Sequence, residues 1–173
     1  GIDTVVMDKT GTLTKGQPEV TDVVVEAIDE ATMLALASAV ERESEHPLAA
    51  AIVEHAEIFD AKNLAADDFL SVPGHGAGAT VDGHRVLVGT AKLMADESVN
   101  LTDLAERHAG LAASGRTAIL VAVDGRAVGV IALADAARET AAPAVAALHA
   151  SGIKVVMLTG DNRSTAQAVA RRL

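Results

Sequence analysis

The sequence predicts an α/β domain that is interrupted by an inserted α+β domain. Near each end of the chain, at residues 2–12 and 153–162, an apolar strand runs directly into a polar turn, a pattern typical of α/β folds. Between them, two Asp-Gly pairs flanked by strand-like residues predict antiparallel hairpins. We therefore expect one domain from residues 1–17 and 134–173, and a second domain inserted at residues 18–133.

The first third of the chain is expected to hold two strands and two helices. Residues 2–8 form a short apolar run with β-branched side chains, which predicts a buried strand, and residues 20–27 predict a second one. Asp29 is a suitable N-cap for one helix, and Pro47 suits the first turn of another. Apolar side chains repeat at helical spacing at Met33, Leu36, Ala37 and Val40, and again at Leu48, Ala51, Ile52, His55 and Phe59.

The middle of the chain predicts an antiparallel sheet flanked by helices. Residues 77–88 and 118–133 each read as a hairpin around an Asp-Gly turn. A helix over residues 101–114, closed by Gly115, separates the two hairpins.

The last forty residues or so return to the α/β pattern. A helix is expected over residues 140–150 and should end at Gly152. The apolar strand 153–158 follows, then the polar turn 159–162, then a helix that runs to Leu173.

Composition excludes several classes of function. The net charge of −10, the pI of about 4.9 and the lack of Trp and Tyr argue against nucleic-acid binding, which needs a basic face and often stacking rings. Zero cysteines exclude disulfides, thiolate metal sites and a cysteine nucleophile. Apolar runs such as residues 118–123 are far shorter than the roughly 20 residues of a membrane span. We expect a soluble chain.

Asp8 is the first candidate for chemistry. It ends a predicted buried strand and precedes a Thr/Gly-rich turn, which is where open α/β sheets bind ligands. Its carboxylate is suited to hold a divalent cation or to attack a phosphoryl group, while the amides of Thr10–Thr12 cradle an anion. The alternative is an ordinary aspartate that satisfies local turn amides.

The turn Thr159-Gly160-Asp161-Asn162 follows the second apolar strand in the same way. If the two strands are parallel neighbours, both turns lie at one edge of the sheet and form one phosphate site. The alternative is a plain helix start with Asn162 as its cap.

Two further segments suggest a binding pocket in the inserted region. His46 lies in a charged break between two helices, where its imidazole is suited to stack on a base or to donate a hydrogen bond. Gly74 and Gly76 flank His75 and allow a backbone to come close to a ligand. The alternatives are a solvated helix end and a simple glycine-rich turn. The other histidines have no metal-ligand spacing: His55, His75, His84, His108 and His149.

Taken together, these motifs resemble those of P-type ATPases, in particular the heavy-metal branch. The resemblance covers the whole chain in order and spacing, and it is carried by Asp8–Thr14 (DKTGTLT), Ser44–Leu48 (SEHPL), Gly74–Gly76 (GHG), Asp135–Arg138 (DAAR) and Met157–Asn162 (MLTGDN). It implies a haloacid-dehalogenase-like phosphorylation domain, incomplete here, with an inserted α+β nucleotide-binding domain. The SEHPL form favours a copper(I) exporter.

The resemblance also implies roles for individual residues. Asp8 would accept the γ-phosphoryl group of ATP as an aspartyl phosphate, and Lys9 would neutralise charge beside it. Mg²⁺ would bind Asp8 and the carbonyl of Thr10. Phosphate oxygens would be bound by Thr10, Gly11, Thr159, Gly160 and Asp161, and the adenine pocket would be formed by Glu41, His46, Gly74 and Gly76.

Threonine at position 10 favours a pump over a phosphatase. Soluble phosphatases of the superfamily carry an aspartate two residues after the nucleophile as an acid/base, and a threonine cannot do that work. The phosphoenzyme should therefore persist and drive a hinge closure through crossover segments such as Lys15–Pro18.

The chain departs from the family pattern at its end, where the family's further lysine and GDGxND segment are not present. We therefore expect it to bind ATP but hardly to autophosphorylate. We expect a monomer that lies at the cytosolic face of a membrane as part of an integral membrane pump, with the transmembrane and actuator domains as partners. The alternatives are a soluble phosphatase of the same superfamily and a nucleotide-binding module without chemistry.

Overall fold

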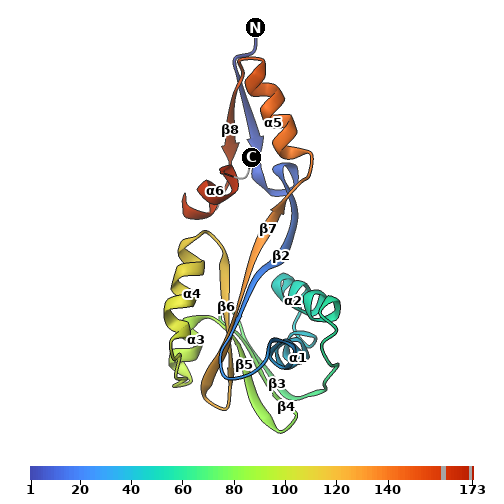
Figure 1. The fold of residues 1–173 in the computed structure, drawn as a ribbon, viewed down its shortest axis with the longest axis vertical. Helices are drawn as coiled ribbons and strands as arrows, with labels where there is room; N and C mark the ends of the chain where they lie inside the picture. The colour runs from blue at the N-terminus through green and yellow to red at the C-terminus, as the bar shows by residue number, and fades with distance from the viewer. Residues whose placement is uncertain (161–162, 172) are drawn as a thin grey trace.

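The computed structural model describes residues 1–160, 163–171 and 173, which form an elongated molecule with two separate sheets (Figure 1). At one end lies a two-stranded parallel sheet that carries both chain termini, and at the other a six-stranded antiparallel sheet with helices on both faces. The two long strands β2 and β7 run from the six-stranded sheet towards the small one. This arrangement agrees with the predicted α/β and α+β regions.

The small sheet pairs β1 (Thr4–Asp8) with β8 (Lys154–Leu158), so the first and last predicted strands are parallel neighbours. Between β1 and β2, the segment η1 (Lys9–Leu13) makes a wide helical turn. Helix α5 (Ala141–Ala150) packs on one face of the sheet through a small apolar cluster that includes Leu13 and Val145. Helix α6 (Arg163–Ala170) follows β8.

The large sheet has the strand order β2-β7-β6-β5-β4-β3. Its strands are β2 (Thr14–Val25), β3 (Ala66–Val72), β4 (Gly76–Val81), β5 (His84–Gly89), β6 (Thr117–Val123) and β7 (Arg126–Ala137). Both predicted Asp-Gly hairpins are confirmed, and both residues of each turn have positive φ, from 49° at Asp124 to 83° at Gly125. A turn with positive φ at both residues matches the twist of the two strands that it joins, and Asp-Gly is one of the pairs that adopt it readily.

Helices cover the two faces of the large sheet. Helices α1 (Glu30–Glu41) and α2 (Pro47–Ile58) pack on one face, and α3 (Ala91–Asp96) and α4 (Leu104–Ala113) pack on the other (Figure 1). Alternate residues of β6 point to the two cores, since Val121 belongs to the first and Leu120 to the second. Asp29 caps α1 as predicted and accepts a 2.7 Å hydrogen bond from the amide of Thr32.

Several predicted boundaries are wrong. Strand β2 begins at Thr14, six residues earlier than predicted, and pairs with β7 along the expected crossover. The predicted helix 101–114 begins only at Leu104. Helix α2 ends at Ile58, so Phe59 lies one residue beyond the helix and is 43% exposed. Its ring stacks on that of the partly buried His55, with ring centroids 6.5 Å apart.

Two short elements were not predicted. Strand β3 is an edge strand whose alternation is broken at Asp68, where φ is 52° and the pairing register shifts. Helix α3 has only six residues, too few for a periodic signal. In the part of the chain that the structure describes, no helix has the length and apolar character needed to cross a bilayer.

Candidate functional site

The turns after β1 and β8 meet at one edge of the small sheet. Asp8 is the last residue of β1 and pairs in register with Leu158, the last residue of β8. Thr159 and Gly160 follow Leu158 directly, and the Asp8 residue is exposed to solvent. The predicted meeting of the two polar turns is therefore confirmed for these residues, while Asp161 lies outside the described residues.

The loop that follows Asp8 has an unusual backbone. Inside η1, Thr10 has an extended conformation with ψ of 122°, and Gly11 has φ of 78°. A Cβ atom on Gly11 would meet no other atom within 4 Å, so the backbone conformation alone requires glycine there. The amide of Thr14 closes the turn by donating to the carbonyl of Lys9.

Polar contacts from β7 and the residues after it hold this loop in place. The Thr14 hydroxyl is fully buried and lies 2.6 Å from Oδ2 of Asp135 and 3.1 Å from the carbonyl oxygen of Lys9. Arg138 donates from Nη2 to the Gly11 carbonyl at 2.7 Å and from Nε to the Thr14 carbonyl at 3.1 Å. Because the shorter contact of Thr14 is made to a carboxylate oxygen, it is the stronger hydrogen bond.

A cavity of about 260 Å³ lies next to the loop, and we call it the loop cavity. Lys9 and Thr10 line it from the loop and Asp135 lines it from β7. Residues 114–116 line it from the turn before β6, and Thr117 from the first position of β6. Lys9 is almost fully buried, with 4% of its surface exposed. Oδ1 of Asp135 is buried and has no hydrogen-bond partner among the described residues.

A second cavity, of about 250 Å³, lies beside the β3–β4 turn, and we call it the hairpin cavity. All four residues that the resemblance assigned to the adenine pocket line it: Glu41, His46, Gly74 and Gly76. They come from the end of α1, the start of α2, the turn before β4 and the first residue of β4. The structure thus brings together residues that are up to 35 positions apart in the sequence.

Glu41 is the most unusual ionisable group of the hairpin cavity. It is 8% exposed, at the end of a helix whose last nine residues are all buried. Burial raises the pKa of Glu41 from 4.5 to about 7, because removal from water disfavours the charged carboxylate. Near neutral pH, this carboxyl group is therefore able both to accept and to donate a hydrogen bond.

His46 is the N-cap of α2. Its Nδ1 accepts a hydrogen bond of 3.2 Å from the amide of Leu48, and Pro47 occupies the first turn as predicted. Since Nδ1 acts as the acceptor, the proton of the neutral ring is on Nε2. The histidine therefore caps a helix, a role that the sequence analysis did not assign to it, and lines the predicted pocket as well.

Glycine occurs at positions 74 and 76 for different physical reasons. Gly74 has φ of 76°, and a Cβ there would meet nothing within 4 Å. Gly76 has φ of 143°, and its Cβ would collide with the Val88 carbonyl oxygen and come within 2.7 Å of the Gly89 Cα. Close packing of β4 against β5 thus requires glycine at position 76. Close approach to a ligand stays a prediction for both.

The two cavities are neighbours, because Leu48 and Thr117 line both of them. A molecule that filled the hairpin cavity would therefore be able to extend past these residues towards Lys9 and Thr10.

Asp8 and Thr10 fit a partial magnesium site. Mg²⁺ is usually bound by one or two carboxylates together with phosphate oxygens and water, and the loop offers the Asp8 carboxylate and the Thr10 carbonyl. Within the described residues, no group of three or more His, Asp or Glu side chains is placed to hold a metal ion. Asp8 and Thr10 thus offer oxygen donors of the kind that Mg²⁺ binds, and the magnesium site itself stays a prediction.

Sequence reasoning missed the residues that hold the loop. Thr14, Asp135 and Arg138 were noted only as parts of motifs, yet their contacts fix η1. The available signal was the charged pair of Asp135 and Arg138 at the end of an apolar run. The residues that they contact lie more than 120 positions earlier in the sequence, so no local pattern links the two segments.

The fold and the paired turns are those of a known class of enzyme. The family profile described as haloacid dehalogenase-like hydrolase matches residues 2–173, so the chain belongs to this family of hydrolases. The fold class predicted from the sequence is confirmed by this match and by the solved structures described next.

The relatives within this class are heavy-metal P-type ATPases, as the motifs predicted. The chain is 46% identical over 173 residues to the copper-exporting P-type ATPase of Staphylococcus aureus strain JH9, covering 99% of this chain and 21% of that protein. It thus spans about a fifth of the length of the curated relatives that it matches.

Two solved structures are also similar. A zinc-transporting PIB-type ATPase in the E2.Pi state matches with a TM-score of 0.90 and 39% identity, over 99% of this chain and 28% of that one. The catalytic domain of the CPx-ATPase CopB-B, studied for conformational changes upon nucleotide binding, matches with a TM-score of 0.73 and 27% identity, over 99% of this chain and 59% of that one.

Proposed function

We propose that the chain is the ATP-binding and aspartyl-phosphorylation region of a heavy-metal-transporting P-type ATPase. The observation that carries this proposal is the pair of adjoining cavities. One contains all four residues of the proposed adenine pocket, and the other is lined by Lys9 and Thr10, next to the exposed Asp8. The relatives named above support the same assignment.

In the proposed reaction, Asp8 is the nucleophile. One of its carboxylate oxygens attacks the γ-phosphorus of ATP, the bond to the bridging oxygen breaks, and ADP leaves. Lys9 offsets negative charge near the phosphate. The turn formed by Thr10 and Gly11, together with Thr159, Gly160 and Asp161, binds phosphate oxygens. Mg²⁺ held by Asp8 and the Thr10 carbonyl would supply charge neutralisation on the transferred group.

In the nucleotide pocket, the Glu41 carboxyl and the Nε2–H of His46 provide polar contacts to the adenine edge. Gly74 and Gly76 keep the wall of the pocket free of side chains. Movement of ATP towards Asp8 is a hinge closure of the inserted domain, proposed as residues 18–133, on residues 1–17 and 134–173. The register of β2 against β7 is interrupted between Thr14 and Pro18, which supports bending at this position.

The copper(I) ion is the favoured cargo, supported by the name of the relatives at 46% identity, whereas the structural neighbour at 39% identity is named as a zinc transporter. We propose that the chain is monomeric and lies at the cytosolic face of a membrane, with the remaining domains of the pump as its partners. We further propose that the 173-residue chain binds ATP but hardly autophosphorylates.

Calorimetric titration with ATP, with and without Mg²⁺, tests the pocket. His46→Asn is the informative variant, because asparagine is a good N-cap and retains the helix start while the imidazole is lost. We expect at least about tenfold weaker binding, which corresponds to about 1.4 kcal/mol. His149→Gln, at an exposed position of α5, is the control and should bind as wild type does.

Two further results would change the assignment. Sustained labelling by γ-³²P-ATP that is lost in Asp8→Asn would contradict weak autophosphorylation while confirming the nucleophile. A folded chain that binds no ATP but releases phosphate from p-nitrophenyl phosphate would favour the soluble phosphatase. Thr10 argues against that alternative, since a threonine cannot act as the acid/base of fast hydrolysis.

A further inference from the structure

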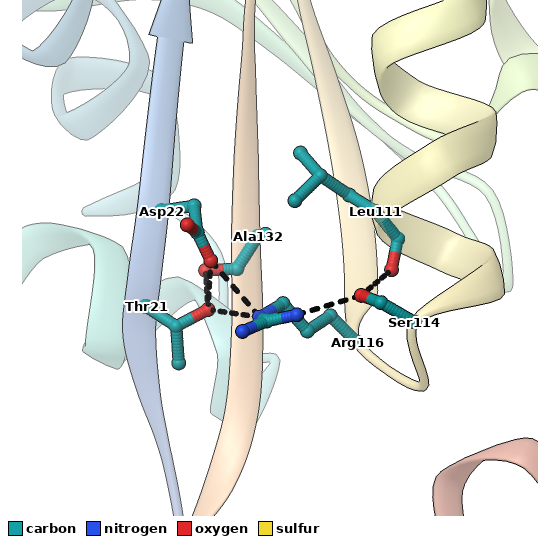
Figure 2. Close-up of polar contacts among 6 residues, drawn as sticks. All are labelled: Thr21, Asp22, Leu111, Ser114, Arg116 and Ala132. Carbon is teal, nitrogen blue, oxygen red and sulfur yellow. Dashed lines mark hydrogen bonds and ion pairs between the residues drawn. The ribbon is translucent and has the colours of Figure 1, made fainter. Parts of the chain in front are cut away.

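Arg116 is held in a fixed position between the large sheet and the end of α4 (Figure 2). Its Nε lies 2.9 Å from Oδ2 of Asp22 and 3.1 Å from the Thr21 hydroxyl, both on β2. Its Nη1 donates to the Ser114 hydroxyl at 2.7 Å, and that hydroxyl in turn donates to the Leu111 carbonyl at 2.6 Å. The guanidinium is thus oriented before any ligand arrives.

These contacts leave part of the guanidinium without a partner among the described residues. Nε and Nη1 are engaged, whereas Nη2 has no hydrogen bond to any described residue. The side chain is only 24% exposed, so it is partly removed from water as well. An arginine fixed on one side, with donors left on the other, is well suited to bind phosphate oxygens.

Arg116 also lies on the route between the two cavities. It lines the loop cavity together with Lys9 and Thr10. The next residue, Thr117, lines both the loop cavity and the hairpin cavity. A nucleotide with its base in the hairpin cavity and its phosphate chain directed towards Asp8 would therefore pass the turn at residues 114–117.

We propose that Arg116 binds the phosphate chain of the nucleotide between the adenine pocket and Asp8. This inference rests on the proposed function, because it assumes that ATP occupies the hairpin cavity. Arg116 contributes the cation on the side of the six-stranded sheet, and Lys9 contributes the cation on the side of the loop. The contacts to Asp22 and Ser114 position the guanidinium, so little side-chain entropy is lost on binding.

The experiment compares ATP with AMP, because AMP contains the same base and sugar but lacks the β- and γ-phosphates. Arg116→Met removes the charge and keeps an apolar side chain of similar length. We expect it to weaken ATP binding by roughly tenfold or more, the usual effect of losing a charge-assisted hydrogen bond, and to leave AMP binding nearly unchanged. Arg116→Lys should give an intermediate loss, because an ammonium retains the charge but not the fork of donors.

Arg126→Met is the matched control for loss of one positive charge. Arg126 stands at the opposite end of the β6–β7 ladder, seven residues along the strand from the partner of Thr117, or about 20 Å away at the usual rise of a strand. Its side chain is 57% exposed and lies 3.8 Å from Glu26. ATP binding by this variant should equal that of wild type.

The possible outcomes separate the two proposals. The inference is overturned if Arg116→Met binds ATP as tightly as wild type, or if its affinities for ATP and AMP fall equally. In either case Arg116 only connects β2 to the end of α4. If wild type binds neither nucleotide, the proposed function itself fails. Both proposals are supported if Arg116→Met weakens the binding of ATP but not of AMP, while Arg126→Met binds ATP as wild type does.

Discussion

The buried carboxyl of Glu41 should make the stability of the chain depend on pH. The folded chain holds the Glu41 proton more tightly than the unfolded chain, because burial raises the pKa from 4.5 to about 7. Stability from this group is therefore fully present below pH 4.5 and is lost as pH rises through 7. One pKa unit corresponds to about 1.4 kcal/mol, so the whole change amounts to about 3 kcal/mol.

Glu41→Gln removes this dependence, because the amide is neutral at every pH and has nearly the same shape. As the pH rises from 4.5 to 8, the free energy of unfolding of wild type should fall by about 3 kcal/mol relative to that of the variant. Urea unfolding at several pH values measures this difference. Circular dichroism is the suitable probe, since the chain contains no Trp or Tyr.

The control is Glu43→Gln, the same chemical change at an exposed position two residues further on. Its stability should follow the wild-type curve at every pH. Parallel curves for wild type and Glu41→Gln would refute the reasoning, because they would mean that the Glu41 carboxyl is ionised in the folded chain at no cost.

Two further substitutions test the packing around the cavities, both by urea unfolding. Gly76→Ala should destabilise the chain by about 3 kcal/mol or more, because its Cβ would collide with the backbone of β5. Gly83→Ala is the control: φ is positive there too, but the Cβ would meet no other atom, so the loss of stability should be only about 1 kcal/mol. Thr14→Val should cost about 1–3 kcal/mol, because it removes the hydroxyl that satisfies Oδ2 of Asp135. Thr14→Ser retains that hydroxyl and should cost less; equal losses would show that the hydrogen bond contributes nothing.

Local signals predicted most of the fold correctly. The turns at Asp82 and Asp124 and the helix ends at Gly115 and Gly152 depend on positive φ values that few residue types adopt, and the cap at Asp29 depends on a short side chain that accepts a hydrogen bond from a nearby amide. Such features can be inferred from a short stretch of sequence, because their causes are local.

The elements that were missed depend on contacts between distant segments. Residues Lys15–Gln17 read as a polar crossover, yet β2 continues through them as an irregular stretch, because β7 pairs with Thr14 on one side of them and with Pro18 on the other. Strand β3 is likewise defined by its pairing with β4, since its own sequence contains two aspartates in succession. Pairing with a partner outweighs weak local propensity in both places.

The same distinction separates the predicted part of the site from the missed part. Asp8 and Gly11 are recognisable because a strand end and a left-handed turn leave a local pattern. The contacts that fix the turn come from Asp135 and Arg138, brought close only by the pairing of β2 with β7. The loop beside the proposed nucleophile is thus held by the same two strands that lead into the large sheet. Any change in how β2 and β7 pair would shift the carbonyls of Gly11 and Thr14, and for this reason the position of the loop depends on strands that lie outside the phosphorylation motif.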